Sequence, residues 1–214
     1  MPIAFDQPPT AGGANVHSPA QTRSVSDFTW SPATRAANAR LRRNVPGLFS
    51  TVTGTAGDDL LYGSPQADLI EGLEGADSLY GLGGDDALYG GSGDNALLGG
   101  SGEDRLYGGE GNDFYYFNIG DGQDRVYSAD SLGQFLEIVH FGAGIDPAQV
   151  TLARVGADLV VNHGNGNGDV VTVVGFFPGG EDPWPRGVDE IWFQDGAIWD
   201  VAEILARLPP GQGL

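Results

Sequence analysis

Large apolar residues recur at every ninth position between Gly54 and Tyr116, and polar, glycine-rich stretches separate them. Each of the seven nine-residue units begins with glycine, and its sixth position holds aspartate or, in the fifth unit, Asn95. A fixed short period is the mark of a solenoid, in which each repeat packs only on its neighbours. The apolar residues, all at the eighth position, are Leu61, Ile70, Leu79, Leu88, Leu97, Leu106 and Tyr115.

The order of residues within a unit predicts a tight turn followed by a short strand. Glycines at the first and fourth positions, and often at the second, permit the left-handed backbone conformations that a tight turn needs. Side chains alternate in direction along a strand, so the eighth position faces inward and the seventh and ninth face outward. Two units then complete one coil, and each unit stacks about 4.8 Å from the second unit after it. We predict an all-β fold with a parallel β-roll over residues 54–127.

The sixth positions form two columns of carboxylates. Stacked like charges at this spacing repel by about 1 kcal/mol per pair even in water, so the columns require cations between their rungs. Carboxylate and turn carbonyl oxygens suit Ca²⁺, whereas Mg²⁺ demands stricter geometry and softer metals prefer Cys or His. Asn95 removes one charge and predicts weaker sites beside it. The expected ligands are Asp59, Asp77, Asn95 and Asp113 in one column and Asp68, Asp86, Asp104 and, after the period slips, Asp124 in the other.

Two units, GGSGEDRLY and GGEGNDFYY, match the consensus GGxGxDxUx, and the region resembles the RTX, or haemolysin-type calcium-binding, nonapeptide family. The resemblance implies several Ca²⁺ ions in the turns of a parallel β-roll. It also implies export by type I secretion machinery, folding outside the cell and hence a secreted or cell-surface location. A flexible Gly/Asp-rich linker is the alternative, and the apolar residue in every unit argues against it.

Residues 128–214 lose the nine-residue period but alternate or run apolar in segments typical of strands. We expect strands within 135–141, 150–155, 157–163, 169–177 and 189–194, a helix over 200–208, and a shared core around Trp184, Trp192 and Trp199. The segments FGAGIDPAQVTLARVGADLVV and IWFQDGAIWD resemble the region that follows RTX repeats in many exported proteins. That resemblance implies a C-terminal cap that carries the secretion signal.

Residues 1–53 differ in charge from the rest of the chain. They hold five Arg and two acids, a balance of +3, whereas residues 54–124 hold fifteen acids and one Arg, a balance of −14. We expect a basic arm that is partly extended, with a short helix over 31–43 that begins at a Ser-Pro pair. The arginines either form a solvated helix face or dock on an acidic roll, in the same chain or in a neighbour.

Composition narrows the classes of partner. The chain of 214 residues has a net charge of −19 and no cysteine, which argues against nucleic acid, anionic membranes and disulfides. We expect no membrane insertion, because no apolar stretch approaches about 18 residues. The N-terminus lacks the features of a usual secretory signal peptide. No GxSxG, HExxH or phosphate-loop motif occurs, so we expect no enzyme activity and no catalytic residue.

The length leaves no room for a catalytic domain beside the arm, the roll and the cap. We therefore expect a secreted calcium-binding structural protein that associates with itself in a surface layer, fibre or extracellular matrix. A calcium-dependent adhesin that binds surface glycans is the alternative, and a non-catalytic portion of a secreted enzyme is a third. The outward ninth-position tyrosines fit either a stabilising ladder of stacked rings or a binding face.

Overall fold

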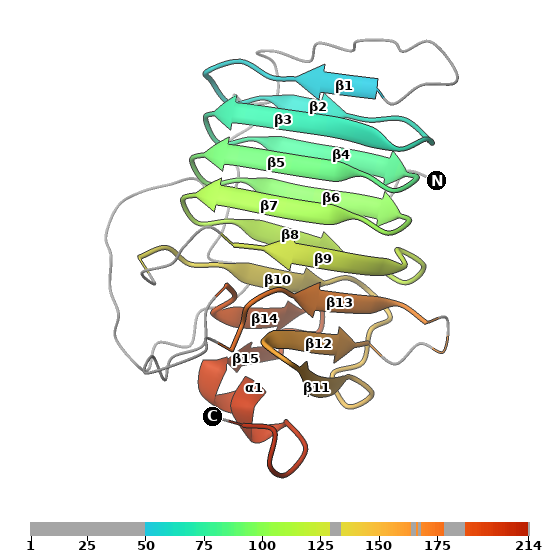
Figure 1. Cartoon of the computed structure of the whole chain (residues 1–214), viewed down its shortest axis with the longest axis vertical. Coiled ribbons are helices and arrows are strands. Elements are labelled where there is room, and N and C mark those ends of the chain that lie inside the picture. Colours follow the sequence, from blue (N-terminus) through green and yellow to red (C-terminus); the bar gives the residue numbers. More distant parts are fainter. Residues whose placement is uncertain (1–49, 129–133, 164–165, 167, 178–186, 214) are drawn as a thin grey trace.

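A computed structural model describes residues 50–128, 134–163, 166, 168–177 and 187–213. These residues form two sheets that face each other and one short helix, α1 (Val201–Ala206) (Figure 1). In spatial order, the eight-stranded sheet contains β1 (Ser50–Thr53), β3 (Asp68–Glu74), β5 (Ala87–Ser92), β7 (Arg105–Glu110), β9 (Gln123–Tyr127), β13 (Val170–Val173), β12 (Asp158–Asn162) and β11 (Thr151–Val155). The seven-stranded sheet contains β15 (Ile198–Asp200), β14 (Glu190–Phe193), β10 (Ile138–Phe141), β8 (Phe114–Phe117), β6 (Ala96–Ser101), β4 (Ser78–Gly83) and β2 (Leu60–Tyr62).

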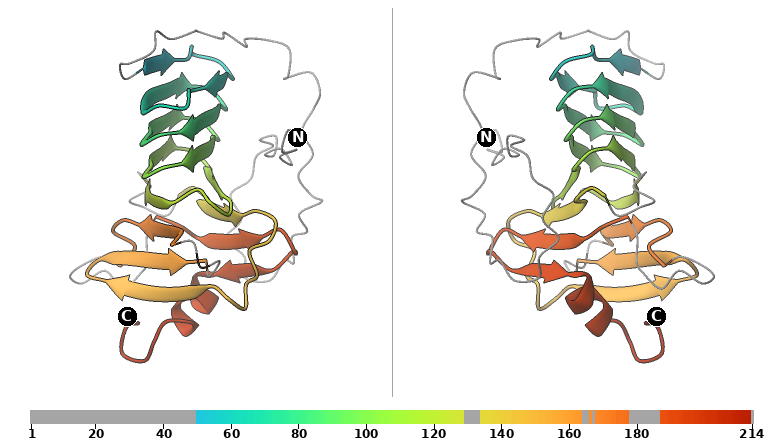
Figure 2. Two further views of the ribbon diagram at one scale, coloured as in Figure 1. Left: turned by 90° about the vertical axis from the view of Figure 1, so that its right-hand side faces the viewer. Right: turned by 90° about the vertical axis from the view of Figure 1, so that its left-hand side faces the viewer.

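The predicted parallel β-roll is confirmed. Odd-numbered strands from β1 to β9 pair in parallel in one sheet, and even-numbered strands from β2 to β8 pair in parallel in the other. Ile70 lies beside Leu88, and Leu79 lies beside Leu97, so one coil takes 18 residues or two units. Figure 2 shows the coils edge-on as a narrow stack that widens at its C-terminal end.

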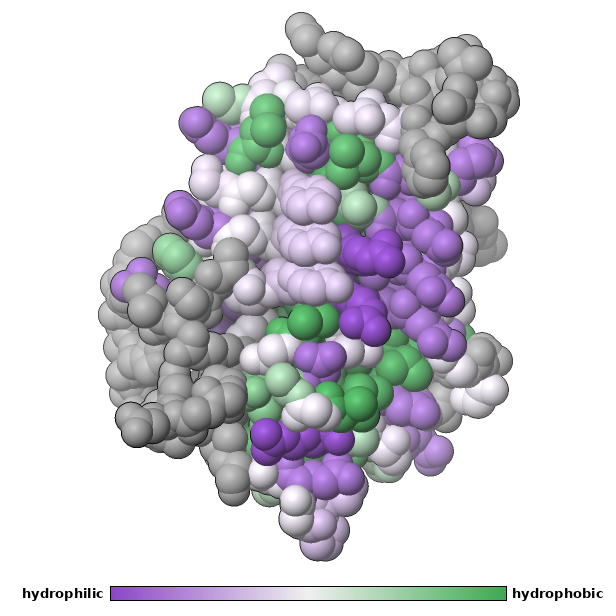
Figure 3. Space-filling view, in the orientation of Figure 1, coloured by the Kyte–Doolittle hydropathy of each residue, from purple (hydrophilic) through white to green (hydrophobic). Residues whose placement is uncertain are grey.

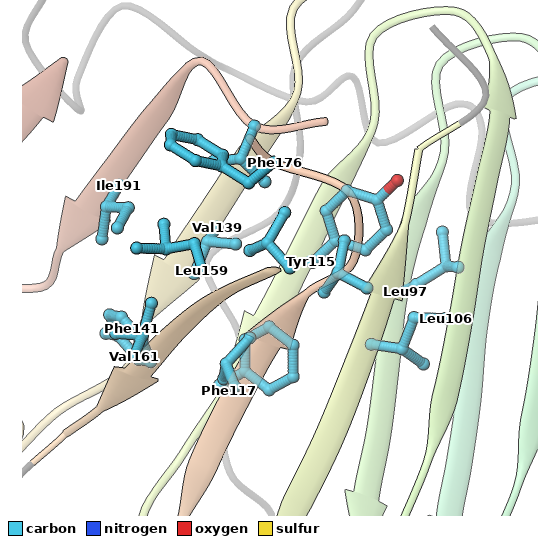
Figure 4. Close-up of a cluster of buried hydrophobic side chains, with 14 of the residues drawn as sticks. Leu97, Leu106, Tyr115, Phe117, Val139, Phe141, Leu159, Val161, Phe176 and Ile191 are labelled. Carbon is cyan, nitrogen blue, oxygen red and sulfur yellow. The ribbon is translucent and has the colours of Figure 1, made fainter. Parts of the chain in front are cut away.

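The core of the roll is the row of eighth-position residues. Six of the seven are Leu, Ile or Tyr side chains with no exposed surface, and Leu61 in the first coil is 3% exposed. Val52 and Val126 extend the row at its two ends, and residues of the C-terminal region continue it without a break (Figure 4). The inward direction predicted for the eighth position is therefore confirmed.

Both sheets of the roll continue into the C-terminal region. β10 pairs in parallel with β8 and β13 pairs in parallel with β9, while β11–β12–β13 and β14–β15 are antiparallel. The five strands expected there are found, together with β15, which the sequence pattern did not predict. The expected helix is α1, shorter than predicted, and Asp200 caps it by accepting a hydrogen bond from the Glu203 backbone N–H at 2.8 Å.

The regions on either side of the roll differ from the sequence expectation in two respects. Residues 50–53, which the sequence assigned to the arm, form β1 of the roll. Trp192 and Trp199 are both buried core residues, as expected, but they do not share a cluster, because Trp199 joins the main core and Trp192 joins a second cluster with Phe114 and Ile138. Alternate residues of a strand point to opposite faces, which separates the two groups. Trp184, the predicted helix over 31–43 and the rest of residues 1–49 lie outside the described residues.

Candidate metal centre

The sixth-position side chains stand in two columns, as the spacing predicts. Each of them is 0–6% exposed, although most are formally charged. Within a column, the backbone N–H of one residue donates a hydrogen bond to the Oδ1 atom of the residue one coil further along. The pairs, with N···O distances of 2.7–3.0 Å, are Asp59–Asp77, Asp68–Asp86, Asp77–Asn95, Asp86–Asp104, Asn95–Asp113 and Asp104–Asp124.

Four of the eight rungs have a second carboxylate oxygen that is buried without a hydrogen bond. This holds for the Oδ2 atoms of Asp77, Asp86, Asp104 and Asp113. The first rungs differ, since Asp59 Oδ2 accepts from the backbone N–H and hydroxyl of Thr55, at 2.5 and 2.8 Å. Removing a charged oxygen from water without a partner is costly. A row of orphaned carboxylate oxygens therefore calls for cations.

The first-position glycines leave room for those cations. A Cβ atom on Gly72 would lie against both Asp77 Oδ2 and the carbonyl oxygen of Gly90, one coil further along. Gly81, Asp86 and Gly99 repeat this arrangement in the other column. Each cradle thus presents a carboxylate and a carbonyl oxygen, the hard donors that Ca²⁺ prefers. No three His, Cys, Asp or Glu side chains converge among the residues described, so backbone carbonyls must supply much of any coordination shell.

The same burial makes the carboxylates difficult to ionise without a cation. Desolvation, with a smaller contribution from the charges of Asp104 and Asp68, raises the pKa of Asp86 to about 8 although the Asp68 backbone N–H lowers it. Desolvation likewise raises the pKa of Asp77 and of Asp113 to about 7. A bound cation would favour the ionised form, so cation and proton compete for these columns.

Asn95 differs from the other rungs in more than charge. Its Nδ2 group donates to the Gly93 carbonyl at 2.9 Å and to the Gly108 carbonyl at 3.5 Å. Gly108 O occupies the place that Gly90 O takes in the cradle of Asp77. The amide therefore donates to a carbonyl that, in the other rungs, faces the expected cation. This arrangement supports the predicted weakness of the neighbouring sites.

The end of the second column contains acids that the period did not reveal. Asp124 lies one coil beyond Asp104, as expected. Asp121 Oδ2 accepts from the Asn118 backbone N–H, and Asp169 Oδ2 accepts from the Gly120 backbone N–H, both at 2.7 Å. Burial and then the charge of Asp169 raise the pKa of Asp121 to about 6. The slipped turn hides both residues from a nine-residue pattern.

The first column also continues beyond the repeats. β10 aligns Ile138 with Phe114 and with Glu190, which places Glu137 and Asp189 in line with Asp113. The sequence did carry a signal, because Glu137-Ile138-Val139 and Asp189-Glu190-Ile191 keep the acid–x–apolar order of positions six to eight. The Glu137 segment lacks the glycine that stands two residues before the acid in most repeats, whereas Gly187, with a φ of 88°, holds this place before Asp189.

Comparison with known proteins agrees with the geometry. The family model of the RTX calcium-binding nonapeptide repeat (four copies) matches residues 51–79, 62–97 and 89–124. A second model, the haemolysin-type calcium binding protein related domain, matches residues 158–203. Calcium binding is thus supported for the region, while the individual ligand residues remain a prediction.

Two individual proteins are similar to parts of the chain. Iron-regulated protein FrpA of Neisseria meningitidis serogroup C is 38% identical over 90 residues, which are 42% of this chain and 8% of that protein. The chain thus spans less than a tenth of this relative. The solution structure of the AlgE6R3 subunit from the Azotobacter vinelandii mannuronan C5-epimerase is 27% identical and covers 61% of this chain and 78% of that one, with a TM-score of 0.22.

Proposed function

The chain is an RTX calcium-binding repeat protein, and from this premise we propose that it is a secreted structural protein that folds on binding Ca²⁺ and assembles with copies of itself. The observation that carries the proposal is the double column of buried carboxylates whose second oxygens face glycine cradles. RTX repeat proteins are typically secreted, which supports an extracellular place of action and type I secretion machinery as a partner.

Calcium would neutralise the stacked carboxylates and so make the folded roll stable. The protein's own part is to hold one oxygen of each rung through a backbone N–H and to aim the other at the cradle. A ligand that binds only the folded state adds about 2.7 kcal/mol per site at 100 times its Kd. Several sites together rival the whole stability of an ordinary domain, about 5–15 kcal/mol.

The N-terminal end of the roll supports assembly. β1 and β2 are the outermost strands of their sheets, and no described strand pairs with their free edges. Such edges present unpaired backbone N–H and C=O groups that can pair with another chain. The basic arm, with its balance of +3, complements the acidic roll. If one molecule's arm or C-terminal region covers the next molecule's edge, the contact is head-to-tail and extends into a filament unless it closes a ring.

The test is the particle mass with and without calcium. We expect light scattering and electron microscopy of the full chain to show growth into filaments or larger particles at millimolar Ca²⁺, reversed by EDTA. Deleting residues 1–45 should abolish the growth, and Gln substitutions at Arg40, Arg42 and Arg43 should weaken it. Monodisperse particles of unchanged mass at millimolar Ca²⁺ would contradict self-assembly without bearing on calcium binding itself.

A second candidate function is calcium-dependent adhesion to surface glycans. Tyr89, Tyr107 and Tyr127 stack at centroid distances of 4.4 and 4.5 Å across β5, β7 and β9. These strands belong to the sheet nearer the viewer in Figure 1, and Figure 3 shows the same side of the molecule. Tyr89 remains 40% exposed, so one end of the stack can contact a sugar ring. A glycan array with the Tyr89→Ala variant as control tests this. The third candidate is that the chain is the non-catalytic portion of a secreted enzyme. This fits the fact that RTX repeat domains are generally non-catalytic.

A further inference from the structure

The junction between the repeats and the C-terminal region keeps the backbone pattern of a calcium rung. The Ile138 N–H donates to the Asp113 carbonyl at 2.9 Å, as the Ser78 N–H donates to the Asp59 carbonyl at 2.8 Å. One rung further, the Glu137 N–H donates to Asp189 Oδ2 at 2.9 Å. This is the N–H to carboxylate bond that links the sixth-position residues of the repeats. Glu137 therefore occupies a sixth position, although no repeat contains it.

The side chains at this junction enclose an unsatisfied oxygen. Asp113 has no exposed surface, and its Oδ2 atom is without a hydrogen bond. A Cβ atom on Gly108 would meet both Asp113 Oδ2 and the Tyr115 hydroxyl. Tyr115 Oη donates to Glu137 Oε2 at 2.9 Å, and Glu137 is 1% exposed. Two carboxylates, from the residues that directly precede β8 and β10, thus approach the cradle of Gly108.

Tyr115 is the residue that distinguishes this rung. The other eighth-position residues are Leu or Ile and have no polar atom, whereas the Tyr115 ring lies in the core with its hydroxyl directed away from Phe117 (Figure 4). Its single proton is donated to Glu137, so it leaves Asp113 Oδ2 unsatisfied. Two buried carboxylates beside a cradle resemble the rungs of the repeats, and they demand a positive charge for the same reason.

We propose that Asp113 and Glu137 ligate a Ca²⁺ ion at the junction, with Tyr115 as a positioning residue that orients the Glu137 carboxylate. The site rests on the proposed calcium-dependent folding but extends beyond the matched repeats, because Asp113 lies within them and Glu137 lies after their end at residue 124. It joins β10, the first strand of the C-terminal region in this sheet, to the last strand of the repeats. Docking of the C-terminal region then depends on calcium as the roll does.

The experiment counts Ca²⁺ bound per full-length chain at fixed free Ca²⁺ by equilibrium dialysis and elemental analysis. The Glu137→Gln variant should bind one ion fewer than the wild type, and the exposed-residue control Glu110→Gln should bind the same number. Asp77→Asn is the reference within the repeats. If Asp77→Asn and Glu137→Gln both leave the count unchanged, the proposed function fails as well. If only Glu137→Gln does so, the junction site alone is overturned.

Tyr115→Phe keeps the buried ring and removes only the hydroxyl. It is the second test of the site and can be used even if Glu137→Gln does not fold. It should weaken one ion's affinity by about 10- to 100-fold, the usual effect of removing a partner that orients a ligand, and leave the other ions unchanged in a chelator competition titration. Unchanged affinities of all ions would overturn the role of Tyr115. An unchanged count together with a higher melting temperature of Glu137→Gln would show that a shared proton joins the two carboxylates, and would also overturn the site.

Discussion

Asn95 shows how a single side chain changes the chemistry of one rung. An aspartate at the sixth position leaves an oxygen that needs a cation, whereas the Asn95 amide donates to the carbonyls around it. The residue still keeps the column intact, because its Oδ1 accepts from the Asp77 N–H at 3.0 Å. One rung is therefore complete without calcium and divides the first column into two parts.

Asn95→Asp should convert this rung into a further calcium site. Without calcium the variant loses two hydrogen bonds and gains a buried charge, so we expect its free energy of unfolding in EDTA to fall by about 1–3 kcal/mol. With calcium it should bind more ions, or bind them more tightly, than the wild type. Urea unfolding with and without Ca²⁺ measures both effects. Gln66→Glu adds the same charge at an exposed turn residue and is the control; equal effects of the two variants would contradict this account.

The sixth-position columns could be predicted from sequence because residue spacing alone determines them. The orphaned oxygens and the Asn95 hydrogen bonds could not, since they depend on rotamers that no period encodes. Glu137 and Asp189 were missed because they lie far beyond the last repeat, although each stands two positions before a buried apolar residue and Asp189 also follows Gly187 at the repeat spacing. The two acids are aligned with the first column by strand pairing in the seven-stranded sheet. That pairing joins residues 24 and 52 positions apart in the sequence, which a nine-residue period does not reveal.

At the scale of elements, two repeats hold a leucine in a strained backbone conformation at the second position, where the consensus has glycine. Leu73 and Leu82 occupy the second position of their units with φ values of 84° and 81°, while Gly91, Gly100 and Gly109 take this position in later units. Both leucines are about half exposed, at 46% and 50%, so they gain little from burial. A left-handed conformation costs a non-glycine residue about 1–2 kcal/mol.

Leu73→Gly and Leu82→Gly should each stabilise the protein by about 0.5–1 kcal/mol, after allowance for the greater freedom of glycine in the unfolded chain. Chemical denaturation at saturating Ca²⁺ measures the change. Leu69→Gly, in β3 at a position without positive φ, is the matched control and should destabilise. The idea fails if Leu73→Gly and Leu69→Gly shift stability in the same direction.

Strand positions were largely predictable, because the repeats and the apolar segments after them mark strands whatever surrounds them. The sequence pattern did not show that β10 and β13 extend the sheets of the roll, since that pairing depends on contacts across long loops. The sequence pattern also grouped Trp192 with Trp199. In the structure they belong to different clusters, because side chains alternate between the two faces along β14 and β15. Composition showed aromatic residues close in sequence but not the faces they share.

For the whole molecule, the acidic columns make stability depend on pH and calcium together. The folded-state pKa values of Asp77, about 7, and Asp86, about 8, lie above the unfolded value of about 4. Without calcium, the stability that proton uptake contributes is fully present below about pH 4 and is lost as pH rises through 7–8. Calcium requires the ionised forms, so its contribution grows over the same range.

We therefore expect EDTA to unfold the roll at pH 8 and to leave much more of it folded at pH 5. Far-ultraviolet circular dichroism at the two pH values, with and without EDTA, measures this difference. The protein in saturating Ca²⁺ is the control and should stay folded at pH 8. A β signal at pH 8 that EDTA leaves unchanged would refute calcium-dependent folding.

The 18-residue coil also has a mechanical consequence. Force applied along the axis of the stack would peel the roll one coil at a time, because each coil is bonded chiefly to the coil before and after it. An extended residue spans about 3.3–3.6 Å, so each released coil would lengthen the chain by about 60 Å in place of the roughly 4.8 Å it occupied. A tethered molecule of this kind would yield in regular steps, and calcium would set the force at which each step occurs.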